Sequence, residues 1–224
     1  MAKKVIAIDG PAGSGKSTTA KLVAQRLHFL YLDTGAMYRA ITLKALENGV
    51  DVNDEKKLEK LTKNSVISFK NENGINKIFL DGKDVSDKIR EPLIDQNVSF
   101  VSVHKKVRKI LVEKQKEIGQ KNNLVAEGRD TTTVVFPNAF KIYLCADIEE
   151  RARRRFLELK DKGIKTSLKE QIKEITKRDK IDSQREASPL RVAKNSVVID
   201  TTYLTIEEQV TKVIELYKAK SGSM

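Results

Sequence analysis

The chain has 224 residues, of which 39% are hydrophobic and 33% are charged. This composition is typical of a folded globular protein and excludes intrinsic disorder. No apolar run is long enough to span a bilayer, and residues 1–4 lead into a strand-like run rather than a cleavable apolar segment. The single cysteine, Cys145, excludes an internal disulfide framework. These features predict a cytoplasmic protein that does not bind membranes.

The formal net charge is +12, from 43 Lys and Arg against 31 Asp and Glu. One interpretation is a basic surface that binds nucleic acid. The other is a solvated lysine-rich surface together with an arginine-lined pocket for small phosphorylated ligands. We favour the second, because several arginines fall within the motifs described below. Aromatic residues make up only 5% of the chain, without tryptophan, so a base-stacking platform has little to build on.

A glycine-rich motif follows the first apolar run and opens directly into a helix-like segment. Its glycines allow successive backbone N–H groups to turn around a polyphosphate, and the following helix presents the positive end of its dipole. The lysine would reach the β- and γ-phosphates, and the serine after it would bind Mg²⁺. This is the P-loop pattern, and it predicts nucleoside triphosphate binding by Gly10-Pro11-Ala12-Gly13-Ser14-Gly15-Lys16-Ser17.

Short apolar runs alternate with segments of helical period along the chain. This alternation predicts an α/β fold with a P-loop NTPase-type, five-stranded parallel sheet and helices on both faces. The expected strands are residues 4–8, 29–32, 124–126, 140–146 and 197–199.

Helix signals lie between these runs. One helix is expected from near Ala36 to Asn48-Gly49, a typical helix end. Residues 93–119 carry apolar side chains at helical spacing. Two capping boxes predict the starts of the last two helices, at Ser167-x-x-Glu170 and Thr205-x-x-Glu208.

Residues 65–86 break this rhythm with short β-like runs at 66–70, 75–80 and 83–85. Asn73-Gly74 and Asp81-Gly82 supply tight turns between them, which predicts a small antiparallel meander. Three strands alone are marginally stable, so we expect this insert to pack beside a ligand-binding cleft. The core domain would then comprise residues 1–64 and 87–224.

Polar residues follow the second and third expected strands. Tyr38 and Arg39 lie one turn into the helix after Asp33, and Arg39 would face the space beside the γ-phosphate. Glu127 ends the third strand, where a carboxylate can hold Mg²⁺ through water. Arg129 and Asp130 then offer opposite charges at one point, for a ligand or for a salt-bridged loop.

Two further segments concentrate arginine. Residues 151–155 hold four arginines, which are costly to place together unless an anion compensates, although a solvated basic face is the usual explanation. Arg178, Asp182 and Arg185 are spaced about one turn apart on an expected helix, where they could also form an ion-paired surface ladder.

Together these motifs resemble the bacterial cytidylate (CMP) kinases, a family of P-loop nucleoside-monophosphate kinases, over almost the whole chain. The meander insert is itself a mark of that family. The other matching segments are residues 8–17, 32–39, 80–86, 128–130, 133–137, 178–185 and 187–190. The resemblance implies phosphoryl transfer from ATP to CMP or dCMP with Mg²⁺ as cofactor, and a mobile lid at about residues 148–170. We expect the protein to be a monomer.

The resemblance also implies a role for each matching residue. ATP would be bound by residues 10–17 with Thr18 and by the lid arginines Arg151, Arg154 and Arg155. The cytosine edge would be read by Ser99, Arg108 and Asp130, and the acceptor phosphate held by Thr34, Tyr38, Arg39 and Arg129. Arg178 and Asp182 would contact sugar and phosphate, Arg185 would help neutralise the transferring group, and Ser17 with Glu127 would hold the metal. The insert would lie at the monophosphate side.

The chain departs from the family pattern in two places. Family members usually carry Asp-Gly-Arg-Asp followed by Ile or Met, Gly and Thr. Here Glu127 replaces the first Asp, and Thr131-Thr132 replaces the pair that contains glycine. Glutamate keeps the carboxylate but lengthens its reach, and losing the glycine removes backbone freedom after Asp130.

Two other functions stay open. A P-loop kinase for AMP, UMP or a non-nucleotide acceptor would share the donor site but not the cytosine-reading set. A non-enzymatic nucleotide switch or nucleic-acid binder would show salt-sensitive polynucleotide affinity and no turnover, although the arginines at 178–185 argue against a pure switch.

Overall fold

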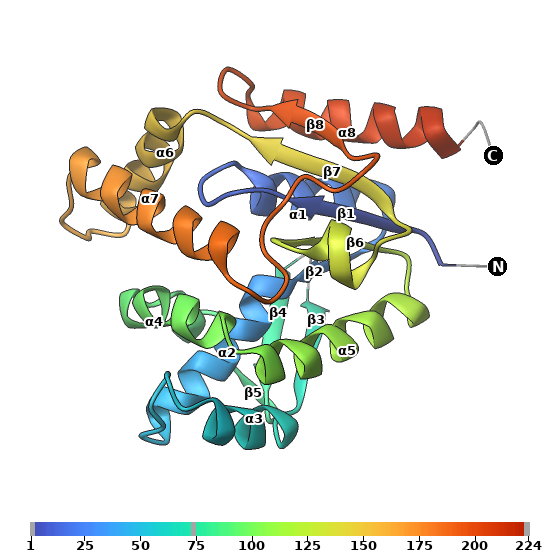
Figure 1. Cartoon of the computed structure of the whole chain (residues 1–224). Coiled ribbons are helices and arrows are strands. Elements are labelled where there is room, and N and C mark those ends of the chain that lie inside the picture. Colours follow the sequence, from blue (N-terminus) through green and yellow to red (C-terminus); the bar gives the residue numbers. More distant parts are fainter. Residues whose placement is uncertain (1–2, 73–74, 222–224) are drawn as a thin grey trace.

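Five parallel strands form the central sheet in the order β2-β6-β1-β7-β8 (Figure 1). The computed structural model describes residues 3–72 and 75–221. The strands of this sheet are β1 (Val5–Asp9), β2 (Leu30–Asp33), β6 (Leu124–Gly128), β7 (Phe140–Cys145) and β8 (Val197–Asp200). The helices are α1 (Lys16–Leu27), α2 (Thr34–Glu47), α3 (Glu55–Lys63), α4 (Pro92–Ser102), α5 (Lys105–Lys121), α6 (Ile148–Asp161), α7 (Leu168–Gln184) and α8 (Ile206–Ser221), with short turns η1 (Lys88–Arg90) and η2 (Thr131–Val135).

Helices cover both faces of this sheet, as predicted. On one face, α1 and α8 pack against β1, β6, β7 and β8 in a cluster that includes Ile6, Val23 and Val213. On the other, α2 and α5 pack against β2 and β6 around Met37 and Leu111. The helices α6 and α7 lie beyond the carboxyl ends of the strands (Figure 1). Within the described ranges, no helix is long and apolar enough to cross a bilayer.

At the carboxyl end of the sheet, β1, β2, β6 and β8 run one or two residues past the predicted apolar runs, whereas β7 ends one residue earlier. Asp9 of β1 pairs with Gly128 of β6, and Asp33 of β2 pairs with Glu127. Phe29 and Ala146 lie just outside the strands to which they were assigned. The polar residues that end β1, β2 and β6 therefore lie side by side at one edge.

The predicted antiparallel insert is confirmed as a second sheet of β3 (Ile67–Glu72), β4 (Ile75–Leu80) and β5 (Lys83–Asp84). The expected turn at Asn73-Gly74 lies outside the described residues. Asp81 and Gly82 both have positive φ and form the second turn. Side chains such as Ile78 and Leu80 bury one face of this sheet against α2, in a cluster that also includes Ile89.

The segment predicted to be helical over residues 93–119 is two helices, α4 and α5, separated at Val103 and His104. Neither residue is a helix breaker, so the break depends on contacts made elsewhere. The His104 Nε2 atom lies 2.8 Å from the Val52 carbonyl oxygen, and Arg108 donates to the Ser102 carbonyl oxygen at 3.0 Å. The change in direction turns Arg108 inward.

Both predicted capping boxes are present. The Ser167 hydroxyl accepts from the Glu170 N–H, and Glu170 accepts from the Ser167 N–H. Thr205 and Glu208 exchange the same pair of bonds at α8. At the other end of α7 the helix stops at Gln184, so Arg185 follows the helix rather than lying on it, because its extended backbone (φ −60°, ψ 142°) breaks the helical turn.

The two threonines that replace the family's glycine-containing pair bind a buried carboxylate. Asp9 is fully buried, and its Oδ1 accepts from the Thr131 N–H and hydroxyl at 3.0 and 2.7 Å. Its Oδ2 accepts from the Thr132 N–H and hydroxyl at 2.8 and 2.6 Å. Four hydrogen bonds thus tie the end of β1 to η2, a single turn of π-helix. They offset part of the effect of burial, which raises the pKa of Asp9.

We expect Thr132→Val to destabilise the protein by about 1–3 kcal/mol, because a short bond to a buried carboxylate is lost at nearly constant volume. Thr133→Val is the matched control, since the half-buried Thr133 hydroxyl makes only a 3.4 Å contact with the Asp130 carbonyl oxygen. Urea denaturation of both variants measures the difference. Equal destabilisation by the two substitutions would show that the bond from Thr132 to Asp9 contributes no more to stability than the Thr133 contact.

Candidate active site

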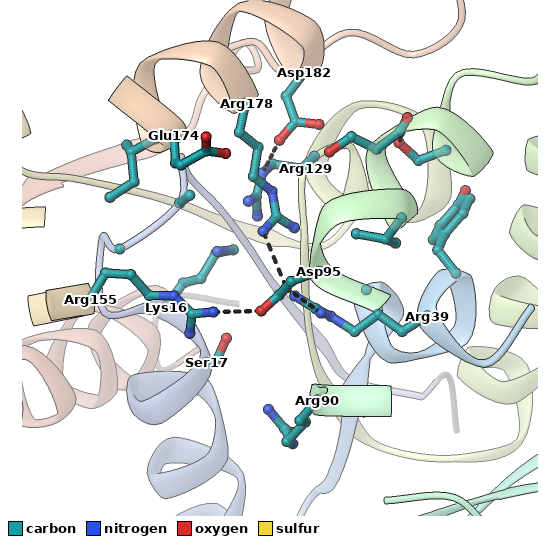
Figure 2. Close-up of a pocket in the computed structure, with 18 of the residues that line it drawn as sticks. Lys16, Ser17, Arg39, Arg90, Asp95, Arg129, Arg155, Glu174, Arg178 and Asp182 are labelled. Atoms are coloured by element: carbon teal, nitrogen blue, oxygen red, sulfur yellow. Dashed lines mark hydrogen bonds and ion pairs between the residues drawn. The ribbon is translucent and has the colours of Figure 1, made fainter. Parts of the chain in front are cut away.

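A cavity of about 750 Å³ opens at the carboxyl edge of the sheet, between the P-loop, α2, α4, α6 and α7 (Figure 2). Twelve Lys and Arg residues line it against seven Asp and Glu, an excess of five positive charges. Such an excess suits a ligand with several negative charges. The sequence-predicted residues that line it are Ala12, Gly13, Gly15, Lys16, Ser17, Thr18, Thr34, Tyr38, Arg39, Ser99, Arg108, Glu127, Arg129, Asp130, Arg154, Arg155, Arg178, Asp182 and Arg185.

Four predicted residues do not line this cavity: Gly10, Pro11, Ser14 and Arg151. Arg151 lies behind the P-loop, where its guanidinium donates to the Ala12 carbonyl oxygen at 3.1 Å and pairs with Asp179 at 2.5 Å. Arg151 thus supports the loop backbone and ties it to α7.

The P-loop places Lys16 at the floor of the cavity. Gly13 and Gly15 have φ values of 76° and 85°, which other residues rarely adopt, so both glycines are needed for the turn into α1. The Lys16 side chain folds back over the loop, with Nζ 3.4 Å from the Pro11 carbonyl oxygen and 4.0 Å from Glu127 Oε2. The lysine is only 7% exposed.

Lys16 is a cation without full compensation. Burial, with Arg129 as the next cause, lowers the pKa of Lys16 to about 7, although Glu127 acts in the opposite direction. A bound polyphosphate would remove this imbalance, since it brings negative charge to the same atom.

Tyr31 holds the longer glutamate in place. The buried Tyr31 hydroxyl donates to Glu127 Oε1 at 2.8 Å, and Ser17 hydrogen-bonds to the same carboxyl group. Burial, followed by Asp33, raises the pKa of Glu127 above its ordinary value, against Lys16 and these bonds. The glutamate therefore stays beside Lys16 and Ser17 despite its extra methylene. Its carboxylate and the serine hydroxyl are oxygen donors of the kind that Mg²⁺ prefers.

An arginine cluster forms around Asp95 of α4 in the centre of the cavity (Figure 2). Asp95 lies 2.5 Å from Arg39 of α2, 2.5 Å from Arg155 of α6 and 3.8 Å from Arg178 of α7. Burial, together with Arg129 and Arg39, lowers the pKa of Arg178 to about 10. The Arg178 Nε atom is buried and has no hydrogen-bond partner among the described residues. Glu158 of α6 pairs with Arg155 as well, so three guanidinium groups face two carboxylates and the cluster is short of negative charge.

A second buried pair lies at α5. Arg108 is 3% exposed, pairs with Asp130 at 2.6 Å and stacks over the Tyr38 ring at 5.1 Å. Its Nε atom and the Tyr38 hydroxyl are buried without partners in the described part of the chain. Burial raises the pKa of Tyr38 to about 12, so this hydroxyl remains a donor. Unpaired donors beside a fixed carboxylate are what a planar ligand with mixed donors and acceptors requires.

The third acidic centre is Asp182 of α7. It pairs with Arg129 at 2.8 Å and lies 3.5 Å from Arg185. The sequence placed Asp182 beside Arg178 in one ladder, whereas the ion pair of Arg178 is with Asp95. The ladder is also not on the surface, because Asp182 and Arg185 are 4% and 8% exposed. Arg185 donates to the Ser188 carbonyl oxygen, and its charged neighbours are Arg108, Asp130 and Asp182.

Sequence reasoning missed Asp95 and Tyr31. Asp95 lies in the first turn of α4 after Pro92, where an acidic residue is expected for the helix dipole alone. Tyr31 lies within an apolar run, and only the strand pairing brings it near Glu127. Asp33 is easier to recognise from the sequence than these two residues, because it ends a strand and caps α2 by accepting from the Ala36 N–H at 2.8 Å.

Residues 6–219 match the family model for cytidylate kinase. The chain belongs to the cytidylate kinase family. A cytidylate kinase from Caldanaerobacter subterraneus subsp. tengcongensis is 52% identical over 94% of this chain and 92% of that protein. The cytidylate kinase of Bacillus subtilis is 47% identical over 99% of this chain and 100% of that protein. The family resemblance seen in the sequence is thereby confirmed, and the chain is a phosphotransferase rather than a non-enzymatic switch.

Among solved structures, an uncharacterized protein from Eubacterium ventriosum matches with a TM-score of 0.53 and 14% identity, covering 97% of this chain and 99% of that one. This likeness concerns the fold alone.

For this member of the cytidylate kinase family we expect ATP binding to take up nearly one proton at pH 8. With a pKa of about 7, most Lys16 is neutral at pH 8 in the free protein, and the triphosphate restores its charge. Calorimetry in two buffers of different ionisation enthalpy measures the uptake. Lys16→Arg is the control, because arginine stays charged and takes up almost none. Equal uptake by both proteins would contradict the lowered pKa.

Proposed function

We propose that this protein transfers the γ-phosphoryl group of ATP to CMP or dCMP, which yields ADP and CDP or dCDP. The observation that carries the proposal is one cavity that joins the P-loop lysine, the arginine cluster and the buried Arg108–Asp130 pair. The three groups would bind the donor phosphates, the acceptor phosphate and the acceptor base, respectively. Transfer between two nucleotides requires these three subsites in this order. Family membership supports the same substrates.

The donor would lie over the P-loop, with residues 10–18 around its phosphates and Lys16 at the transferring group. Arg154 and Arg155 approach from α6, in the proposed lid at about residues 148–170. Arg154 donates to the Thr201 carbonyl oxygen at 2.6 Å, which holds it near the loop. The contribution of Arg151 would be indirect, through the Ala12 carbonyl oxygen.

Mg²⁺ would be held by Ser17 and, through water, by Glu127, and when bound it would neutralise charge on the donor phosphates. The fit rests on the donor chemistry, because both residues supply oxygen and Tyr31 fixes the carboxylate. Few protein ligands suit an ion that keeps several waters.

The acceptor phosphate would lie among Arg39, Arg129 and Arg178, near the Tyr38 hydroxyl. Thr34 is fixed at the same edge by donating to the Glu127 carbonyl oxygen at 2.7 Å. These arginines come from α2, the β6 turn and α7, so they would surround the phosphate from several sides. Catalysis would consist of positioning and charge neutralisation, since the phosphoryl transition state is loose.

The cytosine would be read by Ser99, Arg108 and Asp130, and the sugar by Asp182. The Asp130 carboxylate oxygens can accept from the N4 amino group, and Arg108 can donate to O2 and N3. The contacts of Arg185 with Asp182 and the Arg108–Asp130 pair support a role at the acceptor nucleotide rather than at the transferring phosphoryl group.

Lys16→Ala should lower kcat by on the order of 10²–10³, the typical cost of removing one donor to developing charge. The fold should be retained, because burying Lys16 is itself unfavourable, as its lowered pKa indicates. Release of ADP from ATP and CMP measures kcat, and the melting temperature serves as the folding control. Turnover within about tenfold of the unmodified protein would contradict the assignment of Lys16.

We expect CMP to be preferred over UMP by up to ~10⁴ in kcat/KM, because uracil presents O4 to Asp130 and a protonated N3 to Arg108. Asp130→Asn should narrow this ratio, since an amide can also donate to O4. A panel of CMP, dCMP, UMP and AMP with both proteins measures it.

Because Asp130→Asn breaks a buried ion pair, its melting temperature must be compared with that of Ser99→Ala, which leaves the pair intact. Equal use of CMP and UMP by the unmodified protein would refute the base-reading role, and preference for AMP or UMP would favour another P-loop kinase.

A further inference from the structure

In the part of the chain that the structure describes, Asp95 is the one acidic residue that contacts all three arginines of the cluster, Arg39, Arg155 and Arg178. Glu158 contacts Arg155 alone. Its carboxylate is 18% exposed and lies in the cavity, not in the protein core. In Figure 2 the three guanidinium groups point toward it from three different helices. All four side chains line the cavity that lies between α2, α4, α6 and α7.

The geometry is that of a bound anion. Charge-assisted pairs between guanidinium and carboxylate have the same form as those between guanidinium and phosphate. Burial acts to raise the pKa of Asp95, but the charges of Arg39, Arg155 and Arg178 lower it below its ordinary value, so Asp95 remains ionised. A single carboxylate cannot satisfy the cluster, because Arg178 remains 3.8 Å away and its Nε has no partner in the described residues. A phosphate offers more charge and more oxygen atoms to the same arginines.

We propose that Asp95 is a built-in anion that occupies the acceptor-phosphate subsite of the empty protein. It holds Arg39 and Arg178 of that subsite together with Arg155 of the donor side until the phosphate of the acceptor replaces it. This inference rests on the proposed function for the identity of the acceptor, but not for the charge of the subsite.

Asp95 has two opposing effects on phosphate binding. It orders three flexible side chains before the ligand arrives, which favours binding. It also places a negative charge within a few ångströms of the incoming phosphate, which disfavours binding. Binding breaks the two close ion pairs of Asp95 and leaves its displaced carboxylate beside the phosphate. Together these costs outweigh the entropy of ordering Arg39 and Arg155. Asp95 therefore lowers the affinity for phosphate.

The same carboxylate connects the proposed lid to the acceptor side. Arg155 belongs to α6, and its other terminal nitrogen pairs with Glu158 of the same helix at 2.6 Å. Asp95 and Arg39 belong to α4 and α2. When phosphate displaces Asp95, Arg155 is released from α4 and becomes available to the phosphates. Asp95 is thus a positioning residue that couples the acceptor subsite to α6.

The test compares CMP, cytidine and inorganic phosphate by calorimetry with the unmodified protein and with Asp95→Asn. We expect Asp95→Asn to bind CMP and inorganic phosphate about tenfold more tightly, and cytidine with unchanged affinity, because cytidine lacks the phosphate. Glu91→Gln is the matched control, since it removes one exposed negative charge at the start of the same helix and should change none of the three affinities.

Kinetics give a second readout. The KM for CMP should fall in Asp95→Asn while kcat changes little, whereas a merely structural defect would raise KM or lower kcat. Melting temperatures confirm folding, and Asp95→Ser, with a smaller neutral side chain, should change phosphate affinity in the same direction. Equal or weaker phosphate binding by both variants would overturn the proposal. If CMP binds no better than phosphate to any variant, the proposed function fails while the phosphate result still decides the role of Asp95.

Discussion

The parallel pairing of β6 between β1 and β2 is the constraint on which the site depends. It brings the ends of three strands to one edge, so that the P-loop, Asp33 and Glu127 become neighbours although they are far apart in sequence. The four hydrogen bonds from Thr131 and Thr132 to Asp9 then fix the chain after β6 against the end of β1. Without this register neither Lys16 nor Arg129 would face the cavity.

Positive charge in excess is the second property of the site. Lys16, Arg108 and Arg185 are buried, and two of the carboxylates are shared between arginines. Asp95 serves three arginines and Asp182 serves two. This arrangement is tolerable in the free protein only because each cation keeps a partial partner, and it becomes favourable when phosphates enter. Burial, followed by the nearby charge of Arg129, lowers the pKa of both Lys16 and Arg178.

Much of the fold and of the candidate site could be predicted from the sequence. The strands were located because each is a short apolar run, and their ends were missed by a residue or two because the ladder continues into polar residues such as Asp9 and Asp33. The break between α4 and α5 could not be predicted, because it depends on the contact of His104 with Val52. Helix α3 was not among the expected elements, although Asp54 is a typical helix N-cap residue and caps it by accepting from the Lys57 N–H.

Among the site residues, those in dense motifs were found and those in ordinary surroundings were not. The P-loop and residues 127–130 can be recognised from the sequence because they combine glycines with charged residues. Asp95 lies in the first turn of a helix after Pro92, where acidic residues are common in any protein. Pairing was the least predictable property. The sequence grouped Arg178 with Asp182 by helical spacing. In the structure Arg178 pairs with Asp95 of α4, and Asp182 pairs with Arg129 of the turn after β6, which only the tertiary fold brings to α7.

The bond between Tyr31 and Glu127 has a consequence for how this chain can change over evolutionary time. Shortening Glu127 to aspartate would withdraw the carboxylate from the Tyr31 hydroxyl and leave a buried donor without a partner. Replacing Tyr31 by phenylalanine would free the longer glutamate to swing away from Ser17. Each substitution alone is disfavoured, whereas both together restore a consistent arrangement. The two positions thus form an epistatic pair, and a lineage that carries the longer acid is held to it by a tyrosine on the neighbouring strand.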